Sequence, residues 1–213
     1  MPKNTSPYQF PDPSLANAEG LLAVGGDLHA ERLILAYQNG IFPWYNPSEP
    51  ILWWSPDPRM VLFPEKLKVS KSMKKLFKNE TFRVTTNQNF EAVIQQCAVI
   101  PRAGQDGTWI TNEMIDAYLK LHKLGIAQSV EVWQEDKLVG GLYGIYLKEQ
   151  KVFCGESMFT KVSNASKYGF IWWVKSLQEK GVRLVDCQIY TKHLASLGAE
   201  EISREAFLSY LAV

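Results

Sequence analysis

The sequence predicts an α+β (mixed α/β) fold in which helices flank a central, mainly antiparallel sheet. Several segments carry apolar residues at helical spacing and end near a glycine. Three consecutive β-type segments between residues 129 and 154 are joined by short polar turns, which is typical of an antiparallel meander. Elements of both kinds bury apolar faces against each other, so they are expected to pack in layers around a core.

The composition is that of a globular protein. Of the 213 residues, 46% are apolar and 21% are charged, which provides enough apolar volume for a core and argues against disorder. No apolar run is long enough to span a bilayer, and the first residues lack the apolar stretch of a secretory signal. We therefore expect a cytoplasmic protein that has no membrane partner. Three isolated cysteines and three scattered histidines predict reduced thiols and no metal site.

The first sixty residues predict a small, loop-rich domain. Proline and turn signals recur throughout this region. One helix interrupts them, over residues 29–39, and Gly40 follows at the position of a C-terminal cap. We place the domain boundary after residue 62, so that residues 1–62 form the N-terminal domain and residues 63–213 form the second domain.

A basic helix is predicted at the start of the second domain, over residues 71–78, with Ser70 as its N-cap. Helical spacing places the lysines at 71, 74, 75 and 78 on one face. The cations of residues 66–83 are Lys66, Lys68, Lys71, Lys74, Lys75, Lys78 and Arg83, against the single acid Glu80. Such a face can contact phosphates, although a solvated surface is the more common explanation of a lysine run. The lack of interleaved acids favours an anionic partner.

The remaining elements follow from periodicity, caps and turns. In chain order we predict a strand at 82–86, helices at 89–97 and 112–123, strands at 129–133, 138–146 and 151–154, a helix at 165–180, a strand at 183–188 and a helix at 204–211. Thr111 and Asn164 are the predicted N-caps of the helices that follow them.

Two carboxylates lie near the ends of predicted strands. Glu156 follows the strand at 151–154, and Asp186 lies close to the end of the strand at 183–188. Carboxylates that meet at such a place can orient an amine or accept its proton. Each of them can equally cap a helix or pair with a surface lysine. Spacing alone leaves both interpretations open.

The helix predicted after residue 164 carries a stripe of apolar side chains. Phe170, Trp173 and Leu177 share one face, and together with Met158 and Val185 they could line an apolar pocket. A helix that simply packs in the core has the same pattern, and periodicity does not separate the two cases. Packing in the core is the better interpretation for most of these residues.

Tryptophan is frequent, with seven residues in the chain. Trp44 and Trp109 lie beside turn residues rather than inside regular apolar patterns. Aromatic rings exposed on loops can stack on bases or riboses. The alternative is that such rings bury large surfaces in a region poor in regular structure. We expect one or two of the tryptophans to face a ligand.

Distinctive sequence strings are distributed along the chain. They are GLLAVGGDL at 20–28, AY at 36–37, GIFPW at 40–44, LWWSPDPR at 52–59, GTWIT at 107–111, SVEVW at 129–133, LVGGLYG at 138–144, FCGESMF at 153–159, ASK at 165–167, DCQ at 186–188 and HLASLGA at 193–199. In this order and over nearly the whole chain, they resemble the bacterial leucyl/phenylalanyl-tRNA–protein transferase family. Strings of this length are far more specific than a short motif.

The resemblance implies a small N-terminal domain followed by a domain with the acetyltransferase (GNAT-like) fold. It implies an enzyme that moves leucine or phenylalanine, and sometimes methionine, from aminoacyl-tRNA to a protein that begins with arginine or lysine. The product would enter the bacterial N-degron pathway of protein degradation. Because the donor is already an activated ester, neither ATP nor a metal nor another cofactor is required. We expect a monomer.

The resemblance also implies roles for individual residues. Asp186 and Gln188 match the pair that activates or positions the acceptor's α-amino group, and Glu156 matches an acid of the donor pocket. Trp44 and Trp109 match tryptophans near the terminal adenosine of the tRNA. The family's apolar donor pocket corresponds to Phe153, Met158, Phe170, Trp173, Leu177 and Val185.

Two other functions remain open. An acyl-CoA-dependent N-acetyltransferase on the same fold needs a glycine-rich pyrophosphate loop, and residues 102–107 do not fit it, because Gln105 stands where the first glycine should be. A non-catalytic tRNA-binding module would explain the lysine face and the loop tryptophans. It offers no reason for a cluster of Glu156, Asp186 and Gln188.

Overall fold

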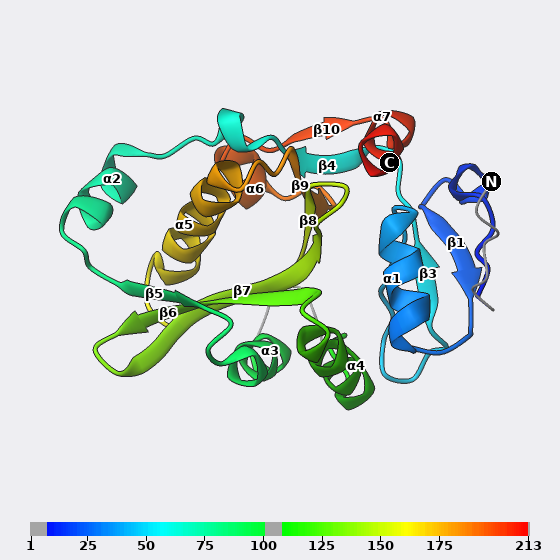
Figure 1. The fold of residues 1–213 in the computed structure, drawn as a ribbon, viewed down its shortest axis with the longest axis horizontal. Helices are drawn as coiled ribbons and strands as arrows, with labels where there is room; N and C mark the ends of the chain where they lie inside the picture. The colour runs from blue at the N-terminus through cyan, green and yellow to red at the C-terminus, as the bar shows by residue number, and fades with distance from the viewer. Residues whose placement is uncertain (1–7, 101–107, 213) are drawn as a thin grey trace.

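A computed structural model of the chain describes residues 8–100 and 108–212, which form two sheets and their flanking helices (Figure 1). The larger sheet has seven strands in the order β10-β4-β9-β8-β7-β6-β5. Their bounds are β10 (Glu200–Ile202), β4 (Arg59–Leu62), β9 (Leu184–Gln188), β8 (Val152–Thr160), β7 (Lys137–Leu147), β6 (Ala127–Gln134) and β5 (Arg83–Thr86). Neighbouring strands are antiparallel except β8 and β9, which are parallel.

Helices cover both faces of the larger sheet. On one face lie α2 (Lys71–Lys78) and α5 (Ala165–Glu179), and on the other lie α3 (Phe90–Val99) and α4 (Asn112–Lys123) (Figure 1). Successive strand residues alternate between the two layers, as Leu142 packs with α5 whereas Tyr143 packs with α3 and α4. The predicted mixed α/β class, with its mainly antiparallel central sheet, is therefore confirmed.

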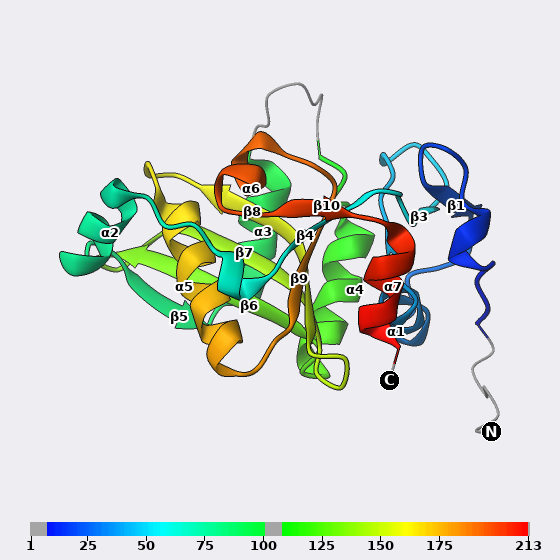
Figure 2. The same cartoon turned by 90° about the horizontal axis from the view of Figure 1, so that it is seen from above.

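The smaller sheet joins β1 (Leu21–Val24), β3 (Leu52–Trp54) and β2 (Phe42–Pro43) in that order. Beside it lie α1 (Ala30–Gln38) and the last helix, α7 (Arg204–Leu211), whose apolar residues belong to the same cluster as α4 (Figure 2). The strand β4 lies inside the predicted N-terminal domain, yet it pairs with β9 and β10 of the larger sheet. The boundary after residue 62 stays a prediction.

The predicted helices and central strands are present, with ends that differ by a few residues. Ser70 and Thr111 cap α2 and α4 by accepting from backbone amides, as predicted. Asn164 occupies the N-cap of α5, but its left-handed φ of 68° leaves the side chain without a capping bond to the helix, so that part of the prediction is wrong. The prediction also ended β8 too early. This strand continues to Thr160, which places Glu156 within it.

Several short elements were not predicted. They are the three strands of the smaller sheet, β4, β10, the helix α6 (Lys192–Ser196) and the 3-10 turns at Pro13–Leu15 and Pro64–Lys66. The segment 102–107, considered above as a pyrophosphate loop, lies outside the described residues. Among the described residues, no helix is both long and apolar enough to cross a membrane.

Two glycines face each other where β7 and β8 bend. Gly144 pairs with Gly155 next to an irregularity in register at Tyr143. A Cβ built on Gly144 would lie 2.2 Å from the carbonyl oxygen of Cys154, whereas one on Gly155 would meet only the carbonyl of Asp186, at 3.6 Å. Gly144 therefore allows the close approach of the strands that carry the cavity described below.

We predict that Gly144→Ala lowers the free energy of unfolding by about 3 kcal/mol, because the added carbon forces two backbones apart. Gly155→Ala is the matched control, and it should leave the unfolding free energy within about 1 kcal/mol of the original. Urea unfolding followed by circular dichroism measures both. Equal midpoints for the two variants would contradict the steric argument.

Candidate active site

A cavity of about 410 Å³ opens where the parallel strands β8 and β9 part. The two strands pair only as far as Cys154 and Asp186, so the residues beyond this point line a gap in the sheet. The N-terminal segment and α6 supply further walls. The lining residues are Phe42, Pro43, Trp44, Trp109, Leu142, Tyr143, Phe153, Gly155, Glu156, Ser157, Met158, Phe170, Val185, Asp186, Cys187, Gln188, Ile189, Thr191, His193 and Leu194.

A buried ion pair forms the base of this cavity. The Arg59 guanidinium on β4 donates from Nε to Asp186 Oδ1 at 2.8 Å and from Nη2 to Oδ2 at 2.7 Å. Both side chains are only 1% exposed. The guanidinium lies between two aromatic rings, 4.8 Å from the centroid of Phe42 and 4.6 Å from that of Phe207. This bidentate contact fixes the orientation of the Asp186 carboxylate.

Asp186 in turn fixes the backbone of Gln188. Its Oδ1 atom accepts from the Gln188 backbone amide at 2.9 Å. Gln188 has a φ of 64°, in the left-handed region that residues other than glycine rarely adopt. The hydrogen bond from the backbone amide to the Asp186 carboxylate holds this conformation. The side chain of Gln188 then reaches Glu156, and its Nε2 atom donates to Oε1 at 2.9 Å.

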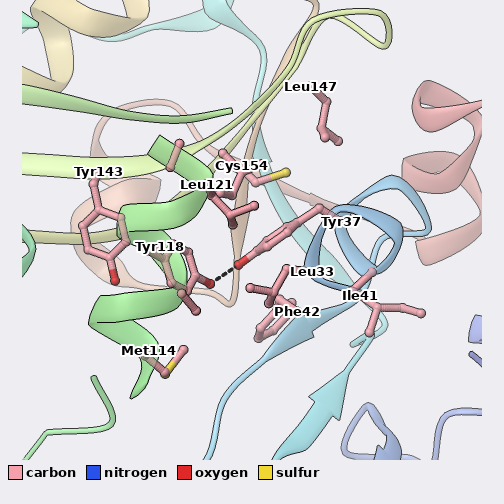
Figure 3. Packing of buried hydrophobic residues seen from close by; sticks show 14 of the residues in the cluster. Leu33, Tyr37, Ile41, Phe42, Met114, Tyr118, Leu121, Tyr143, Leu147 and Cys154 are labelled. Carbon is pink, nitrogen blue, oxygen red and sulfur yellow. Dashed lines mark hydrogen bonds between the residues drawn. The ribbon is translucent and has the colours of Figure 1, made fainter. Parts of the chain in front are cut away.

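Glu156 accepts a second bond from the opposite side. The Tyr118 hydroxyl on α4 donates to Glu156 Oε2 at 2.9 Å. The same hydroxyl is hydrogen bonded to that of Tyr37 on α1 (Figure 3). Removal from water raises the pKa of Glu156 to about 7, and the charge of Asp186 adds to this, whereas the hydroxyls of Tyr37 and Tyr118 and the amide of Gln188 oppose it. The group therefore changes its protonation near neutral pH.

Family models match most of the chain. A model described as leucyl/phenylalanyl-tRNA protein transferase matches residues 61–212, and a model of the N-terminal domain of that family matches residues 26–57. The chain belongs to the leucyl/phenylalanyl-tRNA protein transferase family. This family was named above from sequence strings alone, and the matches confirm that resemblance.

Relatives with this name align over almost their full length. A leucyl/phenylalanyl-tRNA–protein transferase of Christiangramia forsetii is 63% identical, over 95% of this chain and 96% of its own. One of Flavobacterium johnsoniae is 61% identical, over 95% and 94%. A solved GCN5-related N-acetyltransferase-like protein from Streptococcus suis is similar with a TM-score of 0.40 and 12% identity, over 82% of this chain and 64% of that chain.

Most of the residues that the transferase resemblance assigned to substrate line the cavity. Those that do are Trp44, Trp109, Phe153, Met158, Phe170 and Val185. Trp173 and Leu177 do not line it, because α5 turns them into the core, where they are 2% and 0% exposed. Trp173 packs edge-on against Phe153 there. The apolar stripe of α5 is thus mostly core, and Phe170 alone among these three faces the cavity.

The basic residues lie apart from the cavity. The α2 helix stands at the end of the molecule opposite α1 (Figures 1 and 2). Its lysines at 71, 74, 75 and 78 are exposed, and Met73 is buried on the other face, as predicted. Arg83 is exposed as well and lies over the ring of Trp133, 5.2 Å from its centroid. None of the five lines the cavity.

Sequence reasoning missed three residues of this site. Arg59 closes the string at 52–59 and begins β4, a fully buried strand that the sequence did not predict, so its role had no local signal. Tyr37 and Tyr118 sit on the apolar faces of α1 and α4, where a hydroxyl looks no different from a packed ring. The thiols of Cys154 and Cys187 have pKa values raised by burial, so neither is prepared to act as a nucleophile.

We predict that Arg59→Met lowers the free energy of unfolding by about 3–5 kcal/mol, because it leaves the Asp186 carboxylate buried and unpaired. The double variant Arg59→Met/Asp186→Leu should regain much of this loss. Urea unfolding of both variants measures the coupling between the two residues.

The exposed ion pair between Lys66 and Glu200, joined at 2.6 Å, offers a matched control. Water already solvates both of its partners, so Lys66→Met should leave the unfolding midpoint nearly unchanged. A loss for Arg59→Met no larger than that for Lys66→Met would show that the buried pair contributes nothing particular to the fold.

Proposed function

We propose that this chain transfers leucine or phenylalanine from aminoacyl-tRNA to the N-terminal residue of an acceptor protein. Membership of the transferase family supports this activity. The observation that carries the proposal is the cavity, which combines apolar walls with the carboxyl of Glu156 and the amide of Gln188. An apolar amino acid and a reacting amine need these two kinds of surface side by side.

The apolar walls suit the donor side chain. Phe153, Met158, Phe170 and Val185 line the same cavity as Glu156. An apolar pocket separates substrates that differ by one methylene by only about 1–3 kcal/mol. Such a pocket accepts leucine and phenylalanine together, and we extend the proposal to methionine, whose unbranched side chain adapts to irregular space.

The aromatic residues at the cavity suit the terminal adenosine of the tRNA. Trp44 is 37% exposed and Trp109 is partly buried, and both line the cavity. Trp44 is supported from behind by Trp54, at a centroid distance of 5.8 Å. Stacking on such rings holds a base without requiring hydrogen-bond recognition.

The polar residues suit the acceptor amine. Asp186 is engaged through both oxygens by Arg59, so we assign it a positioning role, exerted through the backbone of Gln188. Gln188 then presents its amide beside the carboxyl of Glu156. Holding the amine and the ester together at this point supplies much of the rate through proximity, and the activated ester needs no cofactor.

The proposal also covers the acceptor, the fate of the product, the compartment and the oligomeric state. The acceptor begins with arginine or lysine, whose cationic side chain is favoured near the carboxyl of Glu156. The product is directed to degradation by its new N-terminal residue. The enzyme works as a cytoplasmic monomer. Each of these features extends the family activity beyond the transfer itself.

A single assay tests the main proposal. Radiolabelled Leu-tRNA or Phe-tRNA is incubated with a protein that begins with arginine, without ATP, and the label on the acceptor's N-terminus is measured. The same acceptor with an acetylated N-terminus is the control, and it should remain unlabelled. Acetyl-CoA replaces the aminoacyl-tRNA in a parallel reaction. Transfer from acetyl-CoA alone would replace this proposal with an N-acetyltransferase, and tRNA binding without any transfer would replace it with a binding module.

We predict that changing Lys71, Lys74, Lys75 and Lys78 together to glutamate weakens tRNA binding and flattens its salt dependence. Each lost phosphate contact reduces the slope of log K against log salt by about one. Filter binding at several salt concentrations measures this slope. Lys120→Glu/Lys123→Glu, on the exposed side of α4, is the matched control. An unchanged slope in the α2 variant would show that this face is only solvated.

A further inference from the structure

A directional chain of hydroxyl groups ends on the carboxyl of Glu156. Tyr118 has a single hydroxyl proton, and it donates that proton to Glu156 Oε2 at 2.9 Å. In the bond between the two tyrosines, Tyr37 must therefore be the donor. Both tyrosines are almost fully buried, at 1% and 0% exposure. The two hydrogen bonds thus connect α1, beside the smaller sheet, to a strand of the larger sheet.

Glu156 keeps a free acceptor position at each oxygen. Oε1 accepts from Gln188 Nε2 and Oε2 accepts from Tyr118, one bond each. A carboxylate oxygen has two lone-pair positions, so each oxygen can still take a proton or another donor. Glu156 also lines the cavity. Its charge is held in place from two sides while the carboxyl remains open to a substrate.

Asp186 does not have this freedom. Both of its oxygens accept from Arg59, and Oδ1 accepts from the Gln188 amide as well. Its side chain is 1% exposed. Among the described residues that line the cavity, Glu156 and Asp186 are the acids, and only Glu156 is without a cationic partner.

We infer that Glu156 accepts the proton of the attacking amine, and that Tyr118 and Tyr37 are positioning residues that hold its carboxyl for this step. The inference rests on the proposed function. The neutral acceptor nitrogen bonds to the ester carbonyl carbon and releases one proton to Glu156. The bond from that carbon to the ribose oxygen breaks, and the oxygen keeps the electron pair and takes the proton from Glu156. No other reactant is consumed.

The surroundings of Glu156 suit a general base. Its pKa of about 7, raised mainly by removal from water, lies where a proton acceptor works best at neutral pH. The hydroxyls of Tyr37 and Tyr118 favour the charged form and so keep the pKa from rising further. The titratable and charged groups around it, from each packed element, are Tyr37, Arg59, Tyr118, Tyr143, Cys154, Asp186, Cys187 and His193.

The test is the pH dependence of transfer by the full chain with Leu-tRNA and an acceptor peptide that begins with arginine. The rate should rise with pH as Glu156 loses its proton. Tyr118→Phe removes a donor that favours the charged form, so the midpoint should move up by about one pH unit. The rate then falls several-fold near pH 6.5 and recovers near pH 9. The acceptor amine ionises identically for every variant, so it does not produce a difference between them.

Three further variants complete the experiment. Tyr37→Phe should shift the midpoint in the same direction by a smaller amount, and it serves if Tyr118→Phe fails to fold. Tyr168→Phe is the matched control, because it removes a hydroxyl from a ring that packs on Phe77 outside the cavity. Glu156→Gln should lower kcat more than KM and abolish the part of the pH dependence that the tyrosine variants move.

A carboxyl titration separates this inference from the proposed function. In protein labelled with carbon-13 at the glutamate carboxyl, nuclear magnetic resonance should show one group that titrates near pH 7, disappears in Glu156→Gln and moves upward in Tyr118→Phe. Midpoints of transfer that are unchanged in both tyrosine variants overturn the inference. Absence of any transfer by the unaltered protein overturns the proposed function instead. The titration then shows only whether Tyr118 and Tyr37 set the pKa of Glu156.

Discussion

The buried ion pair between Arg59 and Asp186 is the contact on which the site depends. It joins β4 to β9, places a carboxylate beneath the cavity and holds the left-handed backbone of Gln188. An apolar pair of similar volume would hold two strands together at least as well, because two charges lose their hydration here. What the ion pair adds is a fixed orientation of the Asp186 carboxylate. The carboxylate can accept the Gln188 amide only in the orientation that the guanidinium imposes, and this orientation points the glutamine towards Glu156.

The parts of the fold that could be predicted are those with a local cause. The amphipathic helices and the strands of the meander follow from periodicity and turns within short windows, and their ends were placed to within a few residues except for the end of β8. The strands that were missed are two to four residues long and pair with distant segments. Met60 in β4, for example, meets Gln188 in β9. Nothing within a local window identifies such a partner, and prolines on either side suggested loops.

The site could be predicted in part. The sequence strings singled out Asp186, Gln188 and Glu156, and the structure places these residues together at one cavity. Helical spacing put Phe170, Trp173 and Leu177 on one face, but only the three-dimensional packing shows where the cavity ends along that face. Hydrogen-bond partners of Glu156 from other elements, such as Tyr118, can be identified only once the helices are packed. A tyrosine whose hydroxyl binds Glu156 and a tyrosine that only packs in the core have the same sequence pattern.

The hydrogen bond between Tyr37 and Tyr118 has an evolutionary consequence. It makes α1 part of the electrostatic environment of Glu156, although the two are far apart in the chain. A recombination event that replaced the first fifty residues with those of a distant relative would have to bring a hydroxyl to the same point. The first fifty residues and the rest of the chain are therefore coupled at Glu156, because an exchange that removed the Tyr37 hydroxyl would change the surroundings of this carboxyl.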